Sequence, residues 1–239
     1  MSLRIAIMQP TYLPWVGYFD LMDRVDAFVL LDNVQFEKQS WQQRNRIRTA
    51  KELEWLSLPI LNSGHSGQLI VETRTSGLQF VAKHLKTIAM NYGRSAFFKD
   101  EFPVFEQRFK GAAASGGLAD LNIGLIRWLA ERLGIATPLH ISSQMPCNGK
   151  RSELLVDICR HLGAGEYLSP VGSAEYLRED RHLFDTATIQ VRLHGYEHPV
   201  YRQVYPPFMP FATALDLLFN EGPRALEILR SGRRDSILL

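Results

Sequence analysis

At 239 residues, with 46% hydrophobic and 22% charged side chains, the chain has the composition of an ordinary globular protein that can bury a substantial core. Its formal net charge of only +2 excludes an overall field that would attract nucleic acid or an anionic membrane. No apolar run reaches the roughly 18 residues of a membrane span, and the N-terminal run is too short for a signal peptide. The two cysteines, Cys147 and Cys159, form neither a disulfide framework nor a metal-ligand pattern, so we expect a soluble cytoplasmic protein.

The N-terminal part of the chain predicts a strand, a short helix and a second strand. Residues 3–8 form a hydrophobic run typical of a strand in a parallel sheet, and residues 15–24 carry apolar side chains at helical spacing. Residues 27–32 repeat the buried-strand pattern and complete a βαβ unit. The polar stretch 33–49 is interpreted as a long loop, and residues 55–60 as a third strand.

Helical and strand patterns alternate through the rest of the chain. Helices are predicted at 80–92, 101–109, 118–133, 150–162, 213–219 and 225–229, and strands at 138–145, 166–169 and 189–193. Strands separated by helices predict an α/β fold with a Rossmann-like, mostly parallel sheet and flanking helices. We expect a single domain over residues 1–239, in which residues 78–134 form a helical insertion or cap.

The predicted fold also predicts where a ligand would bind. In open α/β sheets, ligands bind beyond the carboxyl ends of the strands, where the strand order reverses. This rule selects the segments 9–18, 32–48 and 169–173, each of which follows a predicted strand. We therefore expect one site built from three separated pieces of chain, with Trp15, Arg44 and Ser169 around a shared hollow. Gly172 is a further candidate ligand contact in the third segment.

The first segment, QPTYLPWVGYF, is rich in aromatic side chains and proline. Pro10 favours an extended Gln9, whose amide would project at the edge of the sheet. Tyr12 and Trp15 would supply flat apolar surfaces with a polar tip, and Gly17 would allow close approach to the helix N-terminus. The alternative is that Trp15 is a core aromatic residue and Gly17 a packing glycine, and the sequence leaves both interpretations open.

The second segment, residues 32–46, combines amide, cationic and aromatic side chains. An inert loop uses mainly Gly, Ser, Asp and Pro, whereas this one offers hydrogen-bonding groups throughout. We interpret it as anion-binding, in preference to a solvated basic face, because guanidinium groups match phosphate or carboxylate oxygens. Asp32 would orient a ligand hydroxyl or a cation, or would cap a turn. The candidate ligand contacts are Gln35, Lys38, Arg44, Asn45 and Arg46.

The stretch HGYEHPVYRQ provides a third cluster. His194 and His198 are four residues apart, as in a helical metal pair, but Gly195 and Pro199 disfavour a helix, so no metal site is predicted. His198 is a candidate general base, because an unperturbed histidine titrates near neutral pH, and a structural role is the alternative. Two further candidate ligand contacts are Tyr201 and Gln203.

The sequence contains none of the common phosphate-binding or hydrolase motifs, and it identifies no cofactor. It does contain the stretches QPTYLPWVGYFDL (9–21), DNVQFEKQSWQQRNRI (32–47), WLSLPI (55–60), YLSPVGSAEYL (167–177), YEHPVYRQ (196–203) and ALDLLFNEGP (214–223). With these stretches the chain resembles the WbqC-like family, which is associated with bacterial O-antigen and other surface-polysaccharide gene clusters. The resemblance implies a role in decorating an activated sugar, with transfer of glycine or another small acyl group.

The junction Trp15–Tyr18 is also similar to the first strand-to-helix junction of nucleotidylyltransferases of the HIGH-motif type. Both histidines of that motif are missing here. The resemblance therefore implies a shared shape at this junction and not the same phosphate chemistry.

Three hypotheses follow from these patterns. In the first, a transferase acts on a nucleotide-linked amino sugar: the first segment holds a ring, the cations of the second clamp a diphosphate or a donor carboxylate, and His198 deprotonates the attacking amine. Asp32 is the second catalytic candidate. In the alternatives, the chain is a non-catalytic protein that binds a nucleotide-sugar, or a nucleotidylyltransferase-like enzyme without the motif histidines.

Overall fold

The computed structural model describes residues 2–61 and 67–239 and is built around a six-stranded sheet with the order β5-β2-β1-β6-β7-β8. The first five strands in this order run parallel, and β8 pairs antiparallel with β7 at one edge. This arrangement confirms the predicted α/β, Rossmann-like fold. The strands are β1 Leu3–Met8, β2 Ala27–Leu30, β5 Leu139–Ile141, β6 Ala164–Ser169, β7 Gln190–Tyr196 and β8 Arg233–Leu238.

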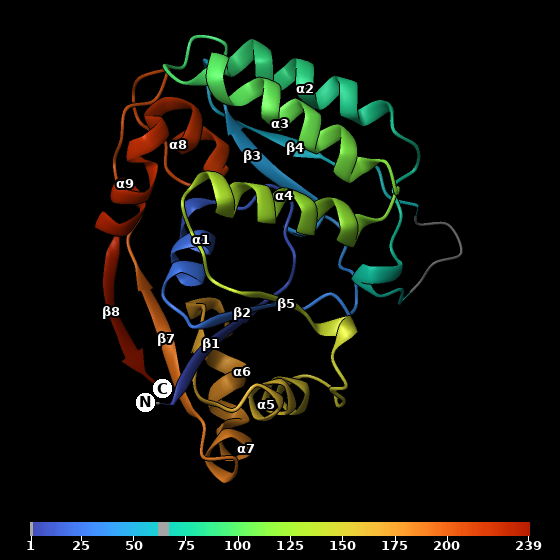
Figure 1. The fold of residues 1–239 in the computed structure, drawn as a ribbon, viewed down its shortest axis with the longest axis vertical. Helices are drawn as coiled ribbons and strands as arrows, with labels where there is room; N and C mark the ends of the chain where they lie inside the picture. Colours follow the sequence, from blue (N-terminus) through green and yellow to red (C-terminus); the bar gives the residue numbers. More distant parts are fainter. Residues whose placement is uncertain (1, 62–66) are drawn as a thin grey trace.

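Helices cover both faces of this sheet (Figure 1). Side chains alternate along β1, so that Ile5 and Ile7 pack on one face while Ala6 packs on the other. The helices on the first face are α5 Ser152–His161, α6 Ala174–Glu179 and α7 Arg181–Thr186. Those on the second face are α1 Val16–Asp23, α4 Leu118–Arg132, α8 Ala214–Glu221 and α9 Ala225–Ser231. The hydrophobic runs of the strands are thus buried from both sides, as expected for a parallel sheet.

A second, two-stranded antiparallel sheet lies away from the main one, beside α4 (Figure 1). It consists of β3 Arg44–Arg48 and β4 Leu53–Ser57, and the helices α2 Gln79–Tyr92 and α3 Phe98–Ala113 lie over it. The prediction that residues 33–49 form a continuous loop is therefore wrong, because it includes β3. The third strand predicted at 55–60 overlaps β4, which belongs to this second sheet. Side chains of β3 alternate between the inner and outer face of this sheet. Because the inward-facing Asn45 is polar, the sequence lacks the hydrophobic alternation that predicts a strand and resembles that of a loop.

Several short elements were not expected from the sequence. Strand β8 contains three charged residues in its sequence RRDSIL, and α6 and α7 have only six residues each. The structure also contains the 3₁₀ turns η1 Ile70–Glu72, η2 Ser142–Gln144, η3 Val171–Ser173 and η4 Gly222–Arg224. Within the described residues, no helix combines the length and apolar character needed to cross a membrane.

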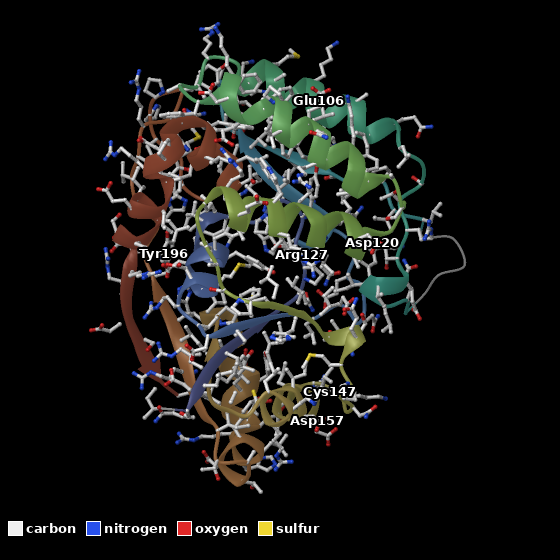
Figure 2. All side chains as sticks on the ribbon, in the orientation of Figure 1. Glu106, Asp120, Arg127, Cys147, Asp157 and Tyr196 are labelled. Carbon is white, nitrogen blue, oxygen red and sulfur yellow. The ribbon has the colours of Figure 1, made fainter. Side chains whose placement is uncertain are left out.

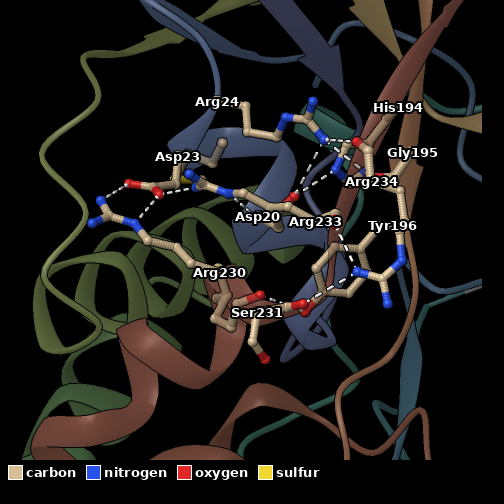
Figure 3. A network of polar contacts seen from close by, with 12 residues as sticks. Asp20, Asp23, Arg24, His194, Gly195, Tyr196, Arg230, Ser231, Arg233 and Arg234 are labelled. Atoms are coloured by element: carbon tan, nitrogen blue, oxygen red, sulfur yellow. Dashed lines mark hydrogen bonds and ion pairs between the residues drawn. The ribbon is translucent and has the colours of Figure 1, made fainter.

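A network of charged side chains holds the edge strand β8 and helix α9 against α1 (Figure 3). Asp20 of α1 is fully buried and accepts hydrogen bonds from Nε2 of His194 at 2.8 Å and from Nε of Arg233 at 2.7 Å. Asp23 accepts a bidentate pair from Arg230 at 2.7 and 2.9 Å. Two carboxylates on one turn of α1 therefore help to fix the C-terminal elements, of which β8 has three charged residues among six.

We expect Asp20→Asn to destabilise the protein, because it keeps the side-chain volume but leaves His194 and Arg233 without their buried anion. A loss of about 3 kcal/mol should lower Tm by roughly 6–12 °C. As a matched control, Asp185→Asn removes an exposed ion pair with Arg181, where both side chains are more than half exposed. This change should cost less than about 0.5 kcal/mol. Equal effects of the two substitutions in urea denaturation would contradict the importance of the network.

Candidate functional site

The loop that joins β1 to α1, residues 9–15, lies where the strand order of the main sheet changes direction. β1 pairs with β2 on one side and with β6 on the other, so the chain extends the sheet first toward β5 and later toward β8. The carboxyl ends of β1 and β6 therefore flank the crevice in which sheets of this type bind ligands. Segment 9–18, which the same rule selects from the sequence, lies at this crevice.

Amide side chains from distant elements fix the backbone of this loop. Asn122 of α4 is fully buried, and its Nδ2 donates to the carbonyl oxygens of Pro10 at 2.9 Å and Gln42 at 2.8 Å. Asn45 of β3 donates through Nδ2 to the carbonyl oxygen of Leu13 at 2.8 Å. Without these donors the three buried carbonyl groups would lose their hydrogen bonds, so the loop conformation depends on both amides.

The loop also contains a strained residue. Leu13 has a φ of 44°, in the left-handed region that a residue other than glycine rarely adopts. The neighbouring backbone is anchored on both sides, by a bond from Tyr12 N to Trp41 O at 2.8 Å and one from Ala214 N to Pro14 O at 2.8 Å. Strain that the surrounding structure maintains in this way occurs preferentially at binding and catalytic sites.

A pocket of about 370 Å³ opens beside this loop. It is lined by Met8, Thr11, Trp15, Tyr18, Trp41, Asn45, Arg46 and Phe211. The structure thus brings three of the predicted contacts, Trp15, Asn45 and Arg46, to one pocket at the carboxyl end of β1. Half of its lining residues are aromatic, and its charge comes from Arg46. A pocket of this size and composition suits a small ligand with a ring and an anionic group.

Arg46 lies beside two tryptophan rings and pairs with no carboxylate among the described residues. It stands opposite Trp55 in the register of β3 and β4, and its Cζ lies 5.6 Å from the ring centre of Trp41 and 5.5 Å from that of Trp55. Its Nε is buried without a hydrogen-bond partner, and the same holds for Arg44, whose Cζ lies 4.3 Å over Trp55. These guanidinium groups can therefore accept an anion as a partner.

His198 lies behind the pocket wall. Its ring stacks on Trp15 with a centroid distance of 6.0 Å and contacts Phe211 at 5.3 Å. Nδ1 lies 2.9 Å from the carbonyl oxygen of Pro199, to which it can donate, while Nε2 is buried without a partner. Burial lowers the pKa of His198, which favours the neutral ring. His198 can thus accept a proton at Nε2, although Trp15 and Phe211 separate it from the pocket.

Three predicted contacts of the first segment do not line the pocket. Tyr12 is fully buried, with its hydroxyl 2.8 Å from Nδ1 of His84. The amide of Gln9 accepts a bond from Nε2 of Gln42 at 2.8 Å. Gly17 packs against the indole of Trp15, and a Cβ there would lie 2.2 Å from Cη2 of that ring. Gly17 therefore fits the packing alternative.

The expected shared hollow around Trp15, Arg44 and Ser169 is not formed, because only Trp15 lines the pocket. Ser169 ends β6 and is fully buried, and Gly172 lies exposed in η3. Asp32 accepts hydrogen bonds from the backbone N–H of Ser143 at 2.9 Å and from its hydroxyl at 2.7 Å. These bonds join the end of β2 to the turn after β5, which fits the capping alternative for Asp32.

Tyr201 and Gln203 also lie outside the pocket and bind Asp216 of α8. The hydroxyl of Tyr201 donates to Oδ2 of Asp216 at 2.7 Å, and Nε2 of Gln203 donates to the same oxygen at 2.8 Å. Asp216 is fully buried, and this burial raises its pKa to about 6. The network fastens the segment that carries His198 and Phe211 to α8. The remaining candidates, Gln35 and Lys38, are exposed.

Two pocket residues had little signal in the sequence. Trp41 is an aromatic residue among the amide side chains of the second segment. The sequence does not indicate that its carbonyl oxygen accepts a hydrogen bond from Tyr12 N in the loop between β1 and α1. Phe211 contributes its ring from a φ of 68°, a conformation that no local pattern predicts. The residue contacts Trp15 at 5.5 Å between ring centroids, which makes it part of the wall.

The remaining reactive groups do not form a second site of this kind. Cys159 is fully buried, and burial raises the pKa of its thiol to about 12. Cys147 lies beside α5 (Figure 2), and burial raises the pKa of its thiol as well. Over residues 2–61 and 67–239, no group of three or more His, Cys, Asp and Glu side chains could hold a metal ion. Two other surface hollows, beside α5 and α7 and at the amino end of β7, are lined by no aromatic residue.

The fold and the pocket define a Rossmann-like α/β protein with an aromatic, arginine-containing pocket at the carboxyl end of β1. Residues 9–228 match the WbqC-like protein family, and the chain belongs to this family. It is 33% identical over 236 residues to a Mycobacterium tuberculosis protein described as uncharacterized protein Rv1507c. The aligned region covers 97% of this chain and 99% of that protein. No solved structure matches the chain.

We expect Asn122→Ala to destabilise the protein by about 2–4 kcal/mol, because the carbonyl groups of Pro10 and Gln42 both lose their donor. Urea denaturation followed by tryptophan fluorescence will measure the loss, since the affected loop carries Trp15. Asn91→Ala is the matched control, because the Asn91 amide bonds within its own helix to Thr87 O. That control should cost less than about 1 kcal/mol, and a similar cost for both variants would show that the loop does not depend on Asn122.

Asp216 should make stability fall as the pH rises. Its folded-state pKa of about 6 exceeds its ordinary value of 3.8, so the folded protein binds the proton more tightly than the unfolded chain. The resulting stabilisation is complete below pH 3.8 and is lost as the pH passes through about 6, a change of about 3 kcal/mol. Asp216→Asn should lack this dependence. Unfolding free energies of both proteins between pH 3.5 and 7.5 will check this, and a constant difference would contradict it.

Proposed function

We propose that this protein binds a nucleotide-linked amino sugar at the pocket beyond β1 and transfers a small acyl group, such as glycyl, to the sugar's amino group. The observation that carries this proposal is the guanidinium group of Arg46, which has no carboxylate partner among the described residues and lines an otherwise largely aromatic pocket at the switch point of the sheet. An unpaired cation beside aromatic rings favours a ligand that combines a phosphate or carboxylate with a ring.

The pocket offers few other polar groups to a ligand. The amide of Asn45 is used by Leu13 O and by the backbone N–H of Arg46, and the hydroxyl of Tyr18 donates to Gln9 O at 3.2 Å. The remaining side-chain groups are the guanidinium of Arg46, the hydroxyl of Thr11 and the indole N–H groups of Trp15 and Trp41. This small set supports recognition of an anion at one end and apolar contact with a ring at the other. The resemblance to the WbqC-like family favours a nucleotide-sugar among ligands of this type.

The proposed transfer forms one C–N bond and breaks one bond to a leaving group. The sugar amine attacks the acyl carbon of an activated donor, such as a thioester or an acyl phosphate, and the donor's leaving group departs with the bonding electrons. The amine must lose a proton, and Nε2 of His198 is the acceptor in this proposal because it is unpartnered and because burial, which lowers the pKa of His198, keeps the ring neutral. Trp15 or Phe211 has to move aside for this step.

A second candidate function is binding of the same nucleotide-sugar without catalysis. The enclosure of His198 by Trp15 and Phe211 favours this alternative, as does the lack of a carboxylate or histidine among the residues that line the pocket. In either case we place the protein in the cytoplasm. The two free thiols, Cys147 and Cys159, support this location.

We expect Arg46→Ala to weaken binding of a UDP-, GDP- or dTDP-linked amino sugar by about 1.5–3 kcal/mol, or roughly 10- to 150-fold, because a charge-assisted hydrogen bond is lost. Isothermal titration with the wild type and the variant will measure this change. Lys51→Ala removes an exposed positive charge near the turn between β3 and β4 and serves as the control for general electrostatic attraction. It should change affinity less than about twofold at physiological salt.

The same proteins can be tested for transfer with acyl thioester donors, using mass spectrometry of the sugar product. Product formation by the wild type that falls in His198→Gln supports the transferase. Binding without product from any donor supports the non-catalytic alternative. If the wild type binds no nucleotide-sugar in the panel, the proposed function is wrong.

A further inference from the structure

The aromatic wall of the pocket continues onto the outer surface of the two-stranded sheet. Trp41 lines the pocket, and its ring centre lies 5.3 Å from that of Trp55, which does not line it. The two residues remain 48% and 44% exposed, respectively, although indole rings are usually buried more completely. This contiguous pair is therefore an aromatic surface that leads outward from the pocket.

The strand pattern of β3 and β4 places both arginines beside this surface. Arg44 and Arg46 alternate with the buried Asn45 and Ile47, so their side chains share the outer face of the sheet with Trp55. The guanidinium group of Arg44 lies over Trp55, and that of Arg46 lies beside both rings. Neither pairs with a carboxylate among the described residues. The surface thus combines flat rings with two cations available to an anion.

The size of the pocket indicates that a nucleotide-sugar would extend onto this surface. Its volume of about 370 Å³ lies near the lower end of the range for ligand pockets, about 300–1,000 Å³. A molecule with a base, a ribose, a diphosphate and a sugar exceeds such a space, so part of it has to lie outside. Arg46 belongs to both the pocket wall and the outer face, and it marks the natural position of the diphosphate between the two parts.

We propose that Trp41 and Trp55 form a second subsite, which stacks the nucleobase of the ligand while Arg44 and Arg46 pair with its diphosphate. This inference rests on the proposed function. Bases stack readily on tryptophan rings and on guanidinium planes, whereas the reacting sugar has to lie near a proton acceptor. His198 lies beyond Trp15, on the inner side of the pocket. The sugar therefore occupies the pocket beside Trp15, and the base lies outside it.

Stacking also predicts what the subsite selects. Every base has an aromatic face, and the subsite consists of two rings and two guanidinium groups, so it should accept uracil, thymine and guanine alike. The protein should then discriminate its ligands mainly by the sugar in the pocket and by the presence of a nucleoside. A sugar phosphate without a base should bind at the pocket alone.

The test is the affinity of Trp55 variants, because Trp55 does not itself line the pocket, although its ring contacts the lining residues Trp41 and Arg46. We expect Trp55→Ala to weaken binding of UDP-glucosamine, and of the GDP- and dTDP-linked amino sugars, by about 5- to 100-fold. Trp55→Phe keeps a ring and should recover most of the affinity. Glucosamine 1-phosphate, which has no base, should bind the wild type and both variants equally.

Tyr176→Ala is the matched control, because Tyr176 is another ring, 40% exposed, on α6 at the opposite face of the main sheet. It should leave every affinity unchanged, and circular dichroism will verify that each variant is folded. If Trp55→Ala binds the nucleotide-sugars as well as the wild type does, the base subsite is wrong while the proposed function stands. An equal loss for glucosamine 1-phosphate would also overturn the assignment to the base. A wild type that binds none of these ligands would overturn both proposals.

Discussion

The loop between β1 and α1 keeps its shape because amide side chains from two distant elements hold its carbonyl groups. Asn45 of β3 holds Leu13, and Asn122 of α4 holds Pro10, so the loop is fixed from outside the βαβ unit to which it belongs. Leu13 would not keep its left-handed conformation in an isolated segment. The two-stranded sheet and the helices over it are therefore needed to give the carboxyl end of β1 a defined wall.

The residue before α8, Thr213, connects the two-stranded sheet to the loop after β1 at the pocket. Thr213 donates its N–H to Arg46 O at 2.9 Å and forms a β-bridge with Trp15. Backbone contacts thus set the distance between the cation and the ring on which the proposed site depends. A site whose walls are connected through main chain loses little conformational freedom when a ligand binds, which favours affinity.

The sequence predicts the elements whose pattern is local and misses those that depend on distant partners. The hydrophobic runs of β1 and β2, together with the rule for parallel sheets, locate the loop at the site correctly. Strand β3 is not predicted from the sequence, because its buried Asn45 is polar. The hydrogen-bond acceptor of that amide is the carbonyl oxygen of Leu13, 32 positions away. The sequence favours Tyr12 as a ligand contact, but its hydroxyl has its partner in His84, 72 positions further along the chain. The ring of Phe211 depends on a backbone angle that the sequence does not reveal.

Gly17 determines how closely the indole of Trp15 can approach α1. A methyl group there would overlap the ring edge, with only 2.2 Å to Cη2. The indole therefore occupies the volume in which the side chain of any other residue at position 17 would lie. Displacing the ring would narrow or widen the gap between Trp15 and Phe211, which bounds the ligand space. Gly17 therefore affects the dimensions of the pocket through Trp15, although Gly17 is not among the residues that line it.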